Sequence, residues 1–425
     1  MSLEALALAP AGHGEHAVST ILMALALVLV GAKLAGELAQ RLGQPAVLGE
    51  LLTGMAFGNL ALLGGPDVSS LAQNETFQVM AELGAILLLF HVGLESTPRE
   101  MAAVGGRALA VAVVGVVTPM LLGFGVGELM RPAESWMLHV FLGAMLTATS
   151  VGITARVLKD AGVLKTPFAR IILGAAVIDD VLGLLILAVV SGIITAAAVG
   201  AELTSAAVLG VVLKAVVFLV GALVVGSLLS PRLFRAALGL RSTGVVLALS
   251  LSFCFALAYL ALRAGLAPIV GAFAAGLVLE EVHFEGQVER GEAPLHESLE
   301  PLIALLVPVF FVRMGMLVDV GSFASAPVLG LAALLTLAAI LGKLACAAAV
   351  PRGISGLTVG LGMMPRGEVG LIFAGIGAGL SLGGRPVVDA GTYAAAVFMV
   401  IATTMATPPL LLWSIRRAAA KETPP

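Results

Sequence analysis

The sequence has few charged residues. Only 12% of its 425 residues are charged, whereas about 25% is usual in a soluble domain. Conversely, 60% are hydrophobic, and the mean hydropathy is +1.09. A soluble core cannot bury this much apolar surface, and the long continuous apolar runs lack the alternation of a β-barrel. The composition therefore excludes a soluble globular protein and indicates a polytopic helical membrane protein.

Cysteine is also scarce. Cys254 and Cys346 lie inside apolar runs and match no metal-binding or redox spacing, which indicates two small buried side chains. The net charge of −3 says little about partners, and we expect no nucleic-acid partner. No basic stretch precedes the first apolar run, so we expect no cleavable signal peptide. No soluble domain follows the last run, so we expect no regulatory nucleotide-binding domain in this chain, and no resident cofactor.

Apolar runs of membrane-spanning length predict thirteen transmembrane helices. They fall near residues 17–38, 46–63, 76–95, 106–127, 136–158, 166–192, 205–229, 240–262, 266–282, 297–317, 325–350, 355–381 and 390–415. We therefore expect an all-α polytopic membrane protein with a single transmembrane domain over residues 17–415. An extracytoplasmic segment, 1–16, precedes this domain, and a cytoplasmic tail, 416–425, follows it.

Lysine and arginine are unevenly distributed between the two sets of loops. Fifteen lie in the loops after odd-numbered segments and in the C-terminal tail, and the other loops carry only Arg131, Arg263 and Arg385. Because basic residues concentrate on the cytoplasmic side, the N-terminus should be outside and the C-terminus cytoplasmic. We expect a multi-pass protein of the cell (inner) membrane.

Two adjacent aspartates, Asp179 and Asp180, lie near the centre of the sixth segment. A charge there costs about 3 kcal/mol, and its usual task is to carry protons or cations. Neighbours on a helix point about 100° apart, so one carboxylate can bind an ion while the other meets a partner. Lys343 is the candidate partner, although its side chain could instead reach the cytoplasmic edge. Since one lysine cannot neutralise two carboxylates, a purely structural ion pair is disfavoured, and a proton and a cation can compete for one site.

Two segments are interrupted by polar residues. The fifth contains Thr147, Thr149 and Ser150, whose hydroxyl oxygens suit a hard cation. The twelfth contains Pro365, which breaks a helix. Broken helices in segments that cross in opposite directions indicate a transporter site at an inverted repeat.

Further charged residues lie within or near the predicted spans. Arg366 and Glu368, beside the second break, either compensate the partial charges of the half-helix ends or form a local ion pair. Arg313 either points outward to Asp319 or faces the core. His91 could sense pH or simply form a local hydrogen bond, for example to Glu95.

These features together resemble the bacterial sodium/proton antiporters of the monovalent cation/proton antiporter superfamily, in its second branch, and most closely the NapA type. The resemblance covers about residues 44–409. The stretches that carry it are Gly-Glu at 49–50, Val-Gly-Leu-Glu at 92–95, Ala-Thr-Ser-Val-Gly-Ile-Thr-Ala-Arg at 148–156, Gly-Ala-Ala-Val-Ile-Asp-Asp-Val-Leu-Gly at 174–183, Ala-Pro-Ile-Val-Gly-Ala-Phe at 267–273, Ile-Leu-Gly-Lys at 340–343 and Pro-Arg-Gly-Glu-Val-Gly-Leu-Ile at 365–372.

The resemblance implies an antiporter fold with inverted repeats and two crossed broken helices. It implies a homodimer, a dimerisation domain and a mobile core that moves like an elevator, with core helices at about 106–192 and 325–415. Asp180 would bind the cation or proton, Asp179 would pair with Lys343, and Thr149 and Ser150 would lie at the helix crossing. The double aspartate implies electrogenic exchange of sodium, and also lithium, for protons, with a role in pH homeostasis.

Two alternatives remain at this stage. A potassium/proton antiporter or a Kef-like potassium efflux system would share the fold and the charged residues. An intramembrane aspartyl protease needs two carboxylates that converge from different helices. Asp179 and Asp180 diverge on one helix, so we expect a transporter and not an enzyme.

Overall fold

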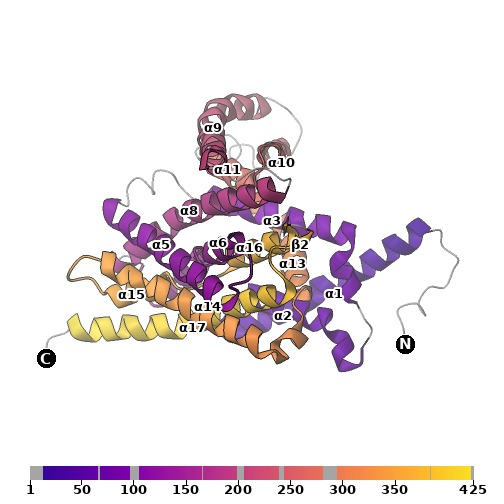
Figure 1. Ribbon diagram of the computed structural model, residues 1–425. Helices are drawn as coiled ribbons and strands as arrows, with labels where there is room; N and C mark the ends of the chain where they lie inside the picture. The colour runs from indigo at the N-terminus through magenta and orange to yellow at the C-terminus, as the bar shows by residue number, and fades with distance from the viewer. Residues whose placement is uncertain are drawn as a thin grey trace.

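The computed structural model describes residues 13–65, 68–95, 105–164, 166–198, 205–238, 244–280, 294–382 and 384–422. These residues form helices, apart from the connecting loops and one two-stranded antiparallel hairpin (Figure 1). Within them, nine helices are long and apolar enough to cross a membrane, and four shorter helices are also apolar.

The elements of the first half are α1 (His13–Arg41), α2 (Ala46–Gly58), η2 (Leu60–Leu63), η3 (Ser69–Gln73), α3 (Glu75–Glu95), α5 (Gly105–Met130), α6 (Trp136–Met145), α7 (Val151–Asp160), α8 (Pro167–Ala198) and α9 (Ser205–Leu238). Those of the second half are α10 (Val245–Arg263), α11 (Pro268–Glu280), α13 (Leu295–Met316), η4 (Val320–Ala324), α14 (Ala326–Leu344), η5 (Ala345–Ala349), α15 (Gly356–Gly362), α16 (Glu368–Gly379), β1 (Ser381–Leu382), β2 (Arg385–Pro386) and α17 (Ala390–Glu422).

Several helices are longer than the apolar runs predict. α8 continues to residue 198 instead of 192, α9 continues to 238 instead of 229, and α17 includes much of the expected cytoplasmic tail. α1 already begins at residue 13, within the segment expected to precede the transmembrane domain. A helix does not have to stop at the predicted end of an apolar run, because residues with good helix propensity, such as the alanines at 196–198 in α8 and 236–237 in α9, continue it.

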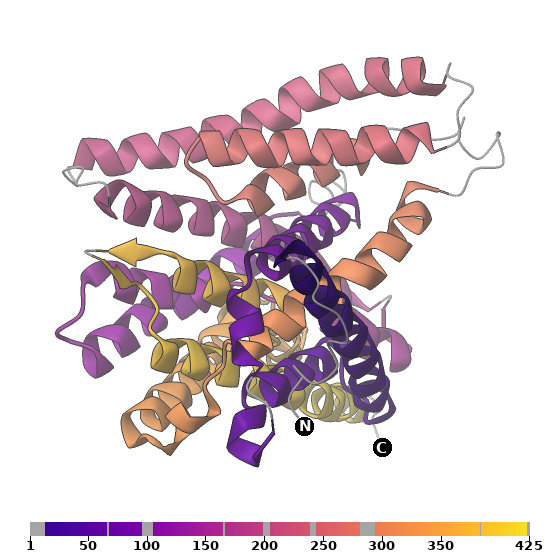
Figure 2. The same cartoon turned by 90° about the vertical axis from the view of Figure 1, so that its right-hand side faces the viewer.

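The helices pack as two groups. The first helix group comprises α1, α2, α3, α10, α11 and α13, which contact one another. The second helix group comprises α5 to α8 and α14 to α17. α9 lies along one side of the molecule with α10 and packs against α8, α10 and α11 (Figures 1 and 2).

Glycines allow very close packing inside the first helix group. A Cβ atom at Gly54 of α2 would lie 2.0 Å from the carbonyl oxygen of Val312 in α13. A Cβ atom at Gly315 of α13 would lie 2.1 Å from the carbonyl oxygen of Leu51 in α2. The two backbones are therefore in direct contact, as is common where small residues line a helix interface in a membrane.

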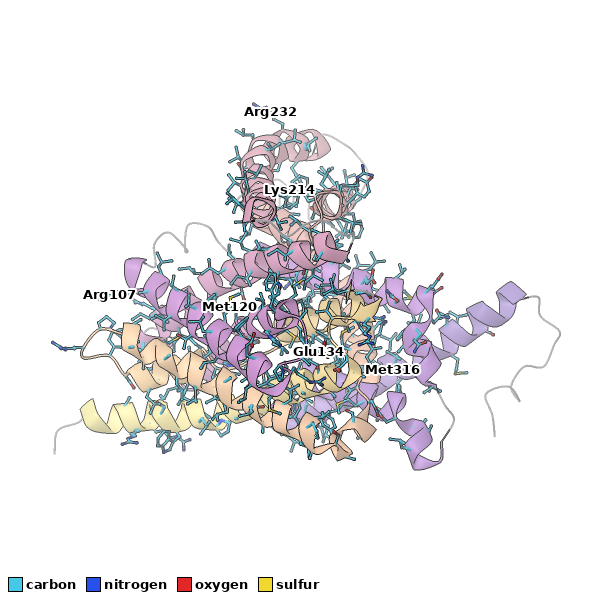
Figure 3. All side chains as sticks on the ribbon, in the orientation of Figure 1. Arg107, Met120, Glu134, Lys214, Arg232 and Met316 are labelled. Carbon is cyan, nitrogen blue, oxygen red and sulfur yellow. The ribbon has the colours of Figure 1, made fainter. Side chains whose placement is uncertain are left out.

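The outer surface carries the side chains that the sequence predicts to meet lipid. Long apolar side chains are exposed along α1 and α9, for example Leu34 at 69% and Leu209 at 66%. Lys214 lies on an exposed face of α9 (Figure 3). Such a long side chain can keep its charge near the membrane surface while its methylenes remain in the apolar layer.

Two helices of the second group are interrupted. α6 ends at Met145 and α7 begins at Val151, so residues 146–150 form a first break. α15 ends at Gly362 and α16 begins at Glu368, so residues 363–367 form a second break. The half-helices are only 7 to 12 residues long, and each break exposes backbone groups that have no partner within the helix.

Candidate functional site

The buried ion pair lies in the second helix group. Lys343, near the end of α14, places its Nζ atom 3.0 Å from Oδ1 of Asp179 in the middle of α8. Both side chains are 0% exposed. The structure thus brings together the two residues that the sequence pairs, and Lys343 does not extend to the membrane edge.

The same lysine also contacts the first break. Its Nζ atom donates a hydrogen bond of 2.7 Å to the carbonyl oxygen of Thr147. The second oxygen of Asp179, Oδ2, has no hydrogen-bond partner among the described residues. Asp180, the next residue of α8, is 7% exposed. Both aspartates are therefore buried, with Asp179 completely enclosed beside a cation and Asp180 almost completely enclosed, its Oδ1 atom included.

Hydrogen bonds join the two breaks directly. The amide of Ser150 donates 2.8 Å to the carbonyl oxygen of Pro365, and the hydroxyl of Thr149 donates 3.2 Å to that of Met363. The hydroxyl of Thr154, in the first turns of α7, donates 2.6 Å to the carbonyl oxygen of Gly362. Thr149 and Ser150 therefore lie where the breaks meet. Thr154 belongs to the same contact and is a site residue that the sequence pattern does not single out.

Arg366 extends from the second break into the first. Its guanidinium is fully buried and donates to the carbonyl oxygens of Ala148 and, at 3.5 Å, of Ala339 in α14. It also interacts electrostatically with Asp179. Arg366 is thus a second buried cation beside the aspartates, in addition to Lys343. The side chain of Glu368, its expected companion, lies outside the described part of the structure.

The cations compensate the end of a half-helix. The C-terminal end of a helix carries partial negative charge, because its last carbonyl groups lack intrahelical partners. α6 ends at Met145, and the carbonyls of Thr147 and Ala148 just beyond it accept from Lys343 and Arg366. The result is a compact buried site in which carboxylates, hydroxyls and backbone carbonyls supply the oxygen atoms that hard cations prefer.

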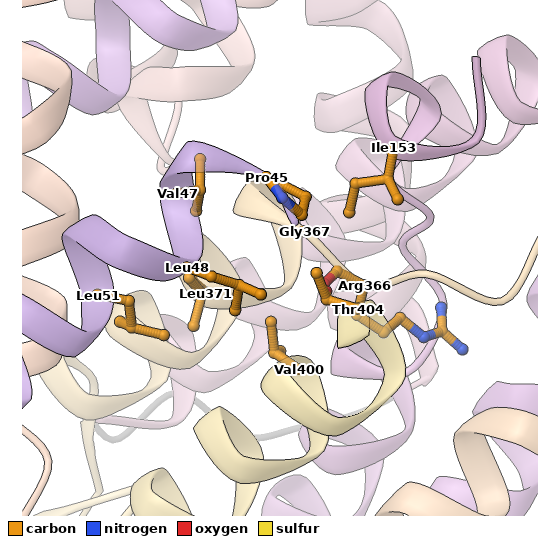
Figure 4. Close-up of a pocket in the computed structure, with 10 residues that line it drawn as sticks. All are labelled: Pro45, Val47, Leu48, Leu51, Ile153, Arg366, Gly367, Leu371, Val400 and Thr404. Atoms are coloured by element: carbon orange, nitrogen blue, oxygen red, sulfur yellow. The ribbon is translucent and has the colours of Figure 1, made fainter. Parts of the chain in front are cut away.

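A small void lies beside this site, between the two helix groups (Figure 4). Its volume is about 30 Å³. The residues that line it are Pro45, Val47, Leu48 and Leu51 from the start of α2, and Ile153, Arg366, Gly367, Leu371, Val400 and Thr404 from the second group. The lining is mainly apolar, so the boundary between the groups is not fully packed here.

Arg313 is half-buried and contacts a neighbouring 3-10 helix. Its Nε atom donates 3.0 Å to the carbonyl oxygen of Ala72 in η3. Asp319 instead accepts from the amide of Gly321 and caps the start of η4. Of the two alternatives, the contact of Arg313 with Asp319 is therefore wrong, and Arg313 connects α13 to η3. The possible contact between His91 and Glu95 lies outside the described side chains.

A polar cluster that the sequence does not reveal lies at the start of α6. His139 is 2% exposed, with Nδ1 2.8 Å from a carboxylate oxygen of Glu128 and Nε2 2.9 Å from the carbonyl oxygen of Arg131. The Arg131 side chain in turn pairs with Asp389 at 3.0 Å. The sequence signal was a histidine, His139, inside an apolar run that follows Glu128. The spacing of these two residues does not predict that they meet.

Comparison with known proteins places the chain in a family. Residues 23–413 match the model of the family described as "Sodium/hydrogen exchanger, transmembrane". The chain is 38% identical to the high-affinity Na⁺/H⁺ antiporter NhaS3 of Synechocystis, over 95% of this chain and 92% of the relative. It is 36% identical to the Na⁺/H⁺-K⁺ antiporter GerN of Bacillus cereus, over 92% and 95%.

The fold agrees with this assignment. The structure of the sodium proton antiporter MjNhaP1 from Methanocaldococcus jannaschii matches with a TM-score of 0.68 over 95% of this chain and 97% of that one. The sequence identity there is 18%, so this match shows the fold alone. Family and relatives are transporters, which excludes the intramembrane protease. The chain is a multi-pass membrane protein and belongs to the transmembrane sodium/hydrogen exchanger family, within the monovalent cation/proton antiporter superfamily.

Proposed function

We propose that this protein exchanges sodium ions for protons across the cell membrane, with Asp180 as the site that either ion occupies. The observation that carries the proposal is the arrangement around α8. Lys343 holds Asp179 in a fully buried pair and also donates to the carbonyl oxygen of Thr147 in the first break, and Asp180 is the next residue of α8, 7% exposed. The relative NhaS3 is a Na⁺/H⁺ antiporter and the relative GerN a Na⁺/H⁺-K⁺ antiporter, which supports sodium as the cation.

A single carboxylate can serve both ions in turn. Protonated Asp180 is neutral, and a cation binds only after the proton has left, so occupation by one excludes the other. Thr149, Ser150 and those carbonyls of the two breaks that do not already accept from Lys343 or Arg366 would supply further oxygen ligands for the cation. Arg366 supports the proposal because its guanidinium holds the first break in place. Glu368 is the first residue of α16, where a carboxylate would compensate the partial positive charge of a helix N-terminus.

Asp179 and Lys343 determine how much charge moves in each cycle. When Asp180 takes a proton or a cation, the neighbouring ion pair can open, and its members can gain or lose a proton. We propose that exchange is electrogenic for this reason, and that lithium, the smaller alkali cation, is also carried.

Alternating access would come from movement of the second helix group against the first. This proposal is supported by the backbone contacts, which are denser within each group than between the groups, and by the void at their boundary. α6 with α7, and α15 with α16, would then each cross the membrane once as crossed broken helices. Counted in that way, the helices make thirteen spans, and the two breaks are the corresponding parts of inverted repeats.

The assay is sodium-driven proton movement in everted membrane vesicles from cells that express the protein. Asp180→Asn removes the titratable group with little change of volume and should abolish the pH change. Asp319→Asn, at an exposed aspartate that begins η4, is the matched control and should retain it. Sodium-driven proton movement in Asp180→Asn at the wild-type rate would refute the assignment.

A cation series decides between the proposed function and its alternative. Lithium, sodium and potassium are offered at equal concentration to liposomes with an imposed voltage. Response to sodium and lithium, with a current, is the expected result. A response to potassium alone would instead indicate a potassium/proton antiporter or a Kef-like efflux system.

The assembly is proposed to be a homodimer in the inner membrane, with the N-terminus outside and the C-terminus cytoplasmic. The exposed apolar faces of α1 and α9 are sufficient for contact with lipid or a second copy. Chemical cross-linking in membranes and labelling of the two termini test these statements.

A further inference from the structure

Tyrosine is rare in this chain, and one of its two tyrosines joins the two helix groups. Tyr393 lies at the start of α17, in the second group, and is 2% exposed. Its hydroxyl donates a hydrogen bond of 2.8 Å to the carbonyl oxygen of Met314, near the end of α13 in the first group. The same hydroxyl lies 3.4 Å from the sulfur of Met314.

The carbonyl of Met314 needs a partner from another helix. α13 ends at Met316, so its last carbonyl groups have no full set of intrahelical donors. The amide of Leu317 bonds to Arg313 and the amide of Val318 bonds to Gly315, which leaves the Met314 oxygen to Tyr393. A conformation in which this buried carbonyl loses its donor is less stable. The hydrogen bond therefore favours the conformation in which the end of α13 meets the start of α17.

The end of α13 is held firmly to the first group. The side-chain amide of Asn59, just after α2, donates 2.8 Å to the carbonyl oxygen of Val318. Arg313 donates to the carbonyl oxygen of Ala72. The Met314 carbonyl is therefore a fixed acceptor, whereas Tyr393 belongs to the group proposed to move.

The boundary is tightly packed at this end. A Cβ atom at Gly375 of α16 would lie 2.7 Å from the sulfur of Met314, so Met314 lies directly on the α16 backbone. The void, in contrast, lies at the opposite end of α2, against Pro45 and the turn that follows α1. By the distribution of basic residues, the turn at Arg41 faces the cytoplasm. The boundary thus has a direct side-chain-to-backbone contact toward the outside and a small void toward the inside.

We propose that the hydrogen bond between the Tyr393 hydroxyl and the Met314 carbonyl is an outer latch that stabilises the inward-facing state of the transporter. This inference rests on the proposed function, because it needs the two helix groups to move against each other. The latch is intact while the site is open to the inside and breaks when the second group moves to open the outside.

The test compares Tyr393→Phe with Tyr259→Phe. The first removes one oxygen atom and keeps the ring, and the second makes the same change at an exposed tyrosine of α10. The KM for sodium is measured from each side, in right-side-out and everted vesicles. Because an apparent affinity scales with the fraction of the competent state, loss of the latch changes the ratio of outside KM to inside KM.

In Tyr393→Phe the ratio of outside to inside KM should fall about five-fold, which corresponds to about 1 kcal/mol. Tyr259→Phe should keep the wild-type ratio. A merely structural defect would lower the maximal rate in both orientations without changing the ratio. An unchanged ratio in Tyr393→Phe, with wild type and Tyr259→Phe active, overturns the latch. Absence of sodium-driven proton movement in the wild type overturns the proposed function instead.

Hydrogen–deuterium exchange of the wild-type chain gives a second decision if Tyr393→Phe does not reach the membrane. Peptides that cover residues 311–318 and 388–396 should change exchange together when sodium is added, in the direction opposite to peptides that cover 45–51. A change at 45–51 with no change at either outer peptide overturns the latch.

Discussion

Replacing Lys343 by alanine tests the central ion pair. The lysine is fully buried and donates both to Asp179 and to the Thr147 carbonyl. Removing it leaves a buried carboxylate without its cation, and breaking such a pair costs about 3–5 kcal/mol. Lys343→Ala should therefore lower the free energy of unfolding by about that amount. Lys214→Ala, at the exposed lysine of α9, should change it by less than about 0.5 kcal/mol.

A double-mutant cycle separates the pair from the rest of the site. A hydrogen bond to a charged group contributes about 1.5–3 kcal/mol, so Asp179→Ala with Lys343→Ala should be less destabilised than the sum of the single variants by about 2 kcal/mol. SDS-induced unfolding in mixed micelles measures the free energies. Strict additivity would refute the reasoning. In liposomes, Lys343→Ala should also change the current per sodium ion. A wild-type current would show that the ion pair does not take part in charge movement.

Three further predictions each depend on local contacts. Thr154→Val removes the hydroxyl that joins the two breaks and should destabilise by about 1 kcal/mol in the same unfolding assay; an unchanged free energy would contradict this. Gly54→Ala places a methyl 2.0 Å from a carbonyl of α13 and should destabilise by about 1–3 kcal/mol, with a wild-type unfolding curve as the contrary result. Burial raises the pKa of Asp389, but the hydrogen bonds from Thr392 and the guanidinium of Arg131 outweigh it and hold that pKa below its usual value. Because the pKa of Asp389 is lower in the folded than in the unfolded protein, its charge stabilises the fold above about pH 4, and this stabilisation is lost as pH falls further. The unfolding midpoints of wild type and Asp389→Asn should therefore differ above pH 4 and converge below it.

The pairing of Asp179 with Lys343 could be predicted because charges deep in a membrane are few. Each such charge is expensive alone, so a buried lysine and a buried carboxylate are obvious partners. The positions of the two breaks were also visible, since Pro365 and the polar run around Thr149 interrupt apolar sequence. These signals are local, and a single sequence contains them.

Contacts between side chains and backbone carbonyls could not be predicted in the same way. Arg366 on Ala148 and Tyr393 on Met314 join residues that are far apart in the sequence and use an acceptor that every residue possesses. Arg366 also changes the charge balance, because two buried cations, and not Lys343 alone, lie near the carboxylates. The guanidinium is buried because the second break packs against the first, a contact between residues 218 positions apart in the sequence.

The separation of the ion pair along the chain has a consequence for biosynthesis. Lys343 follows Asp179 by 164 residues, so α8 is made long before α14. At about 5–20 residues per second, translation of that interval takes roughly 8–33 s. During this time two carboxylates, each costing about 3 kcal/mol in the membrane, await their cation. Insertion of α8 therefore depends on a transient polar environment for the two carboxylates, at the translocon or against earlier helices. Truncation of the chain before residue 343 should lower the fraction of α8 that is inserted into the bilayer.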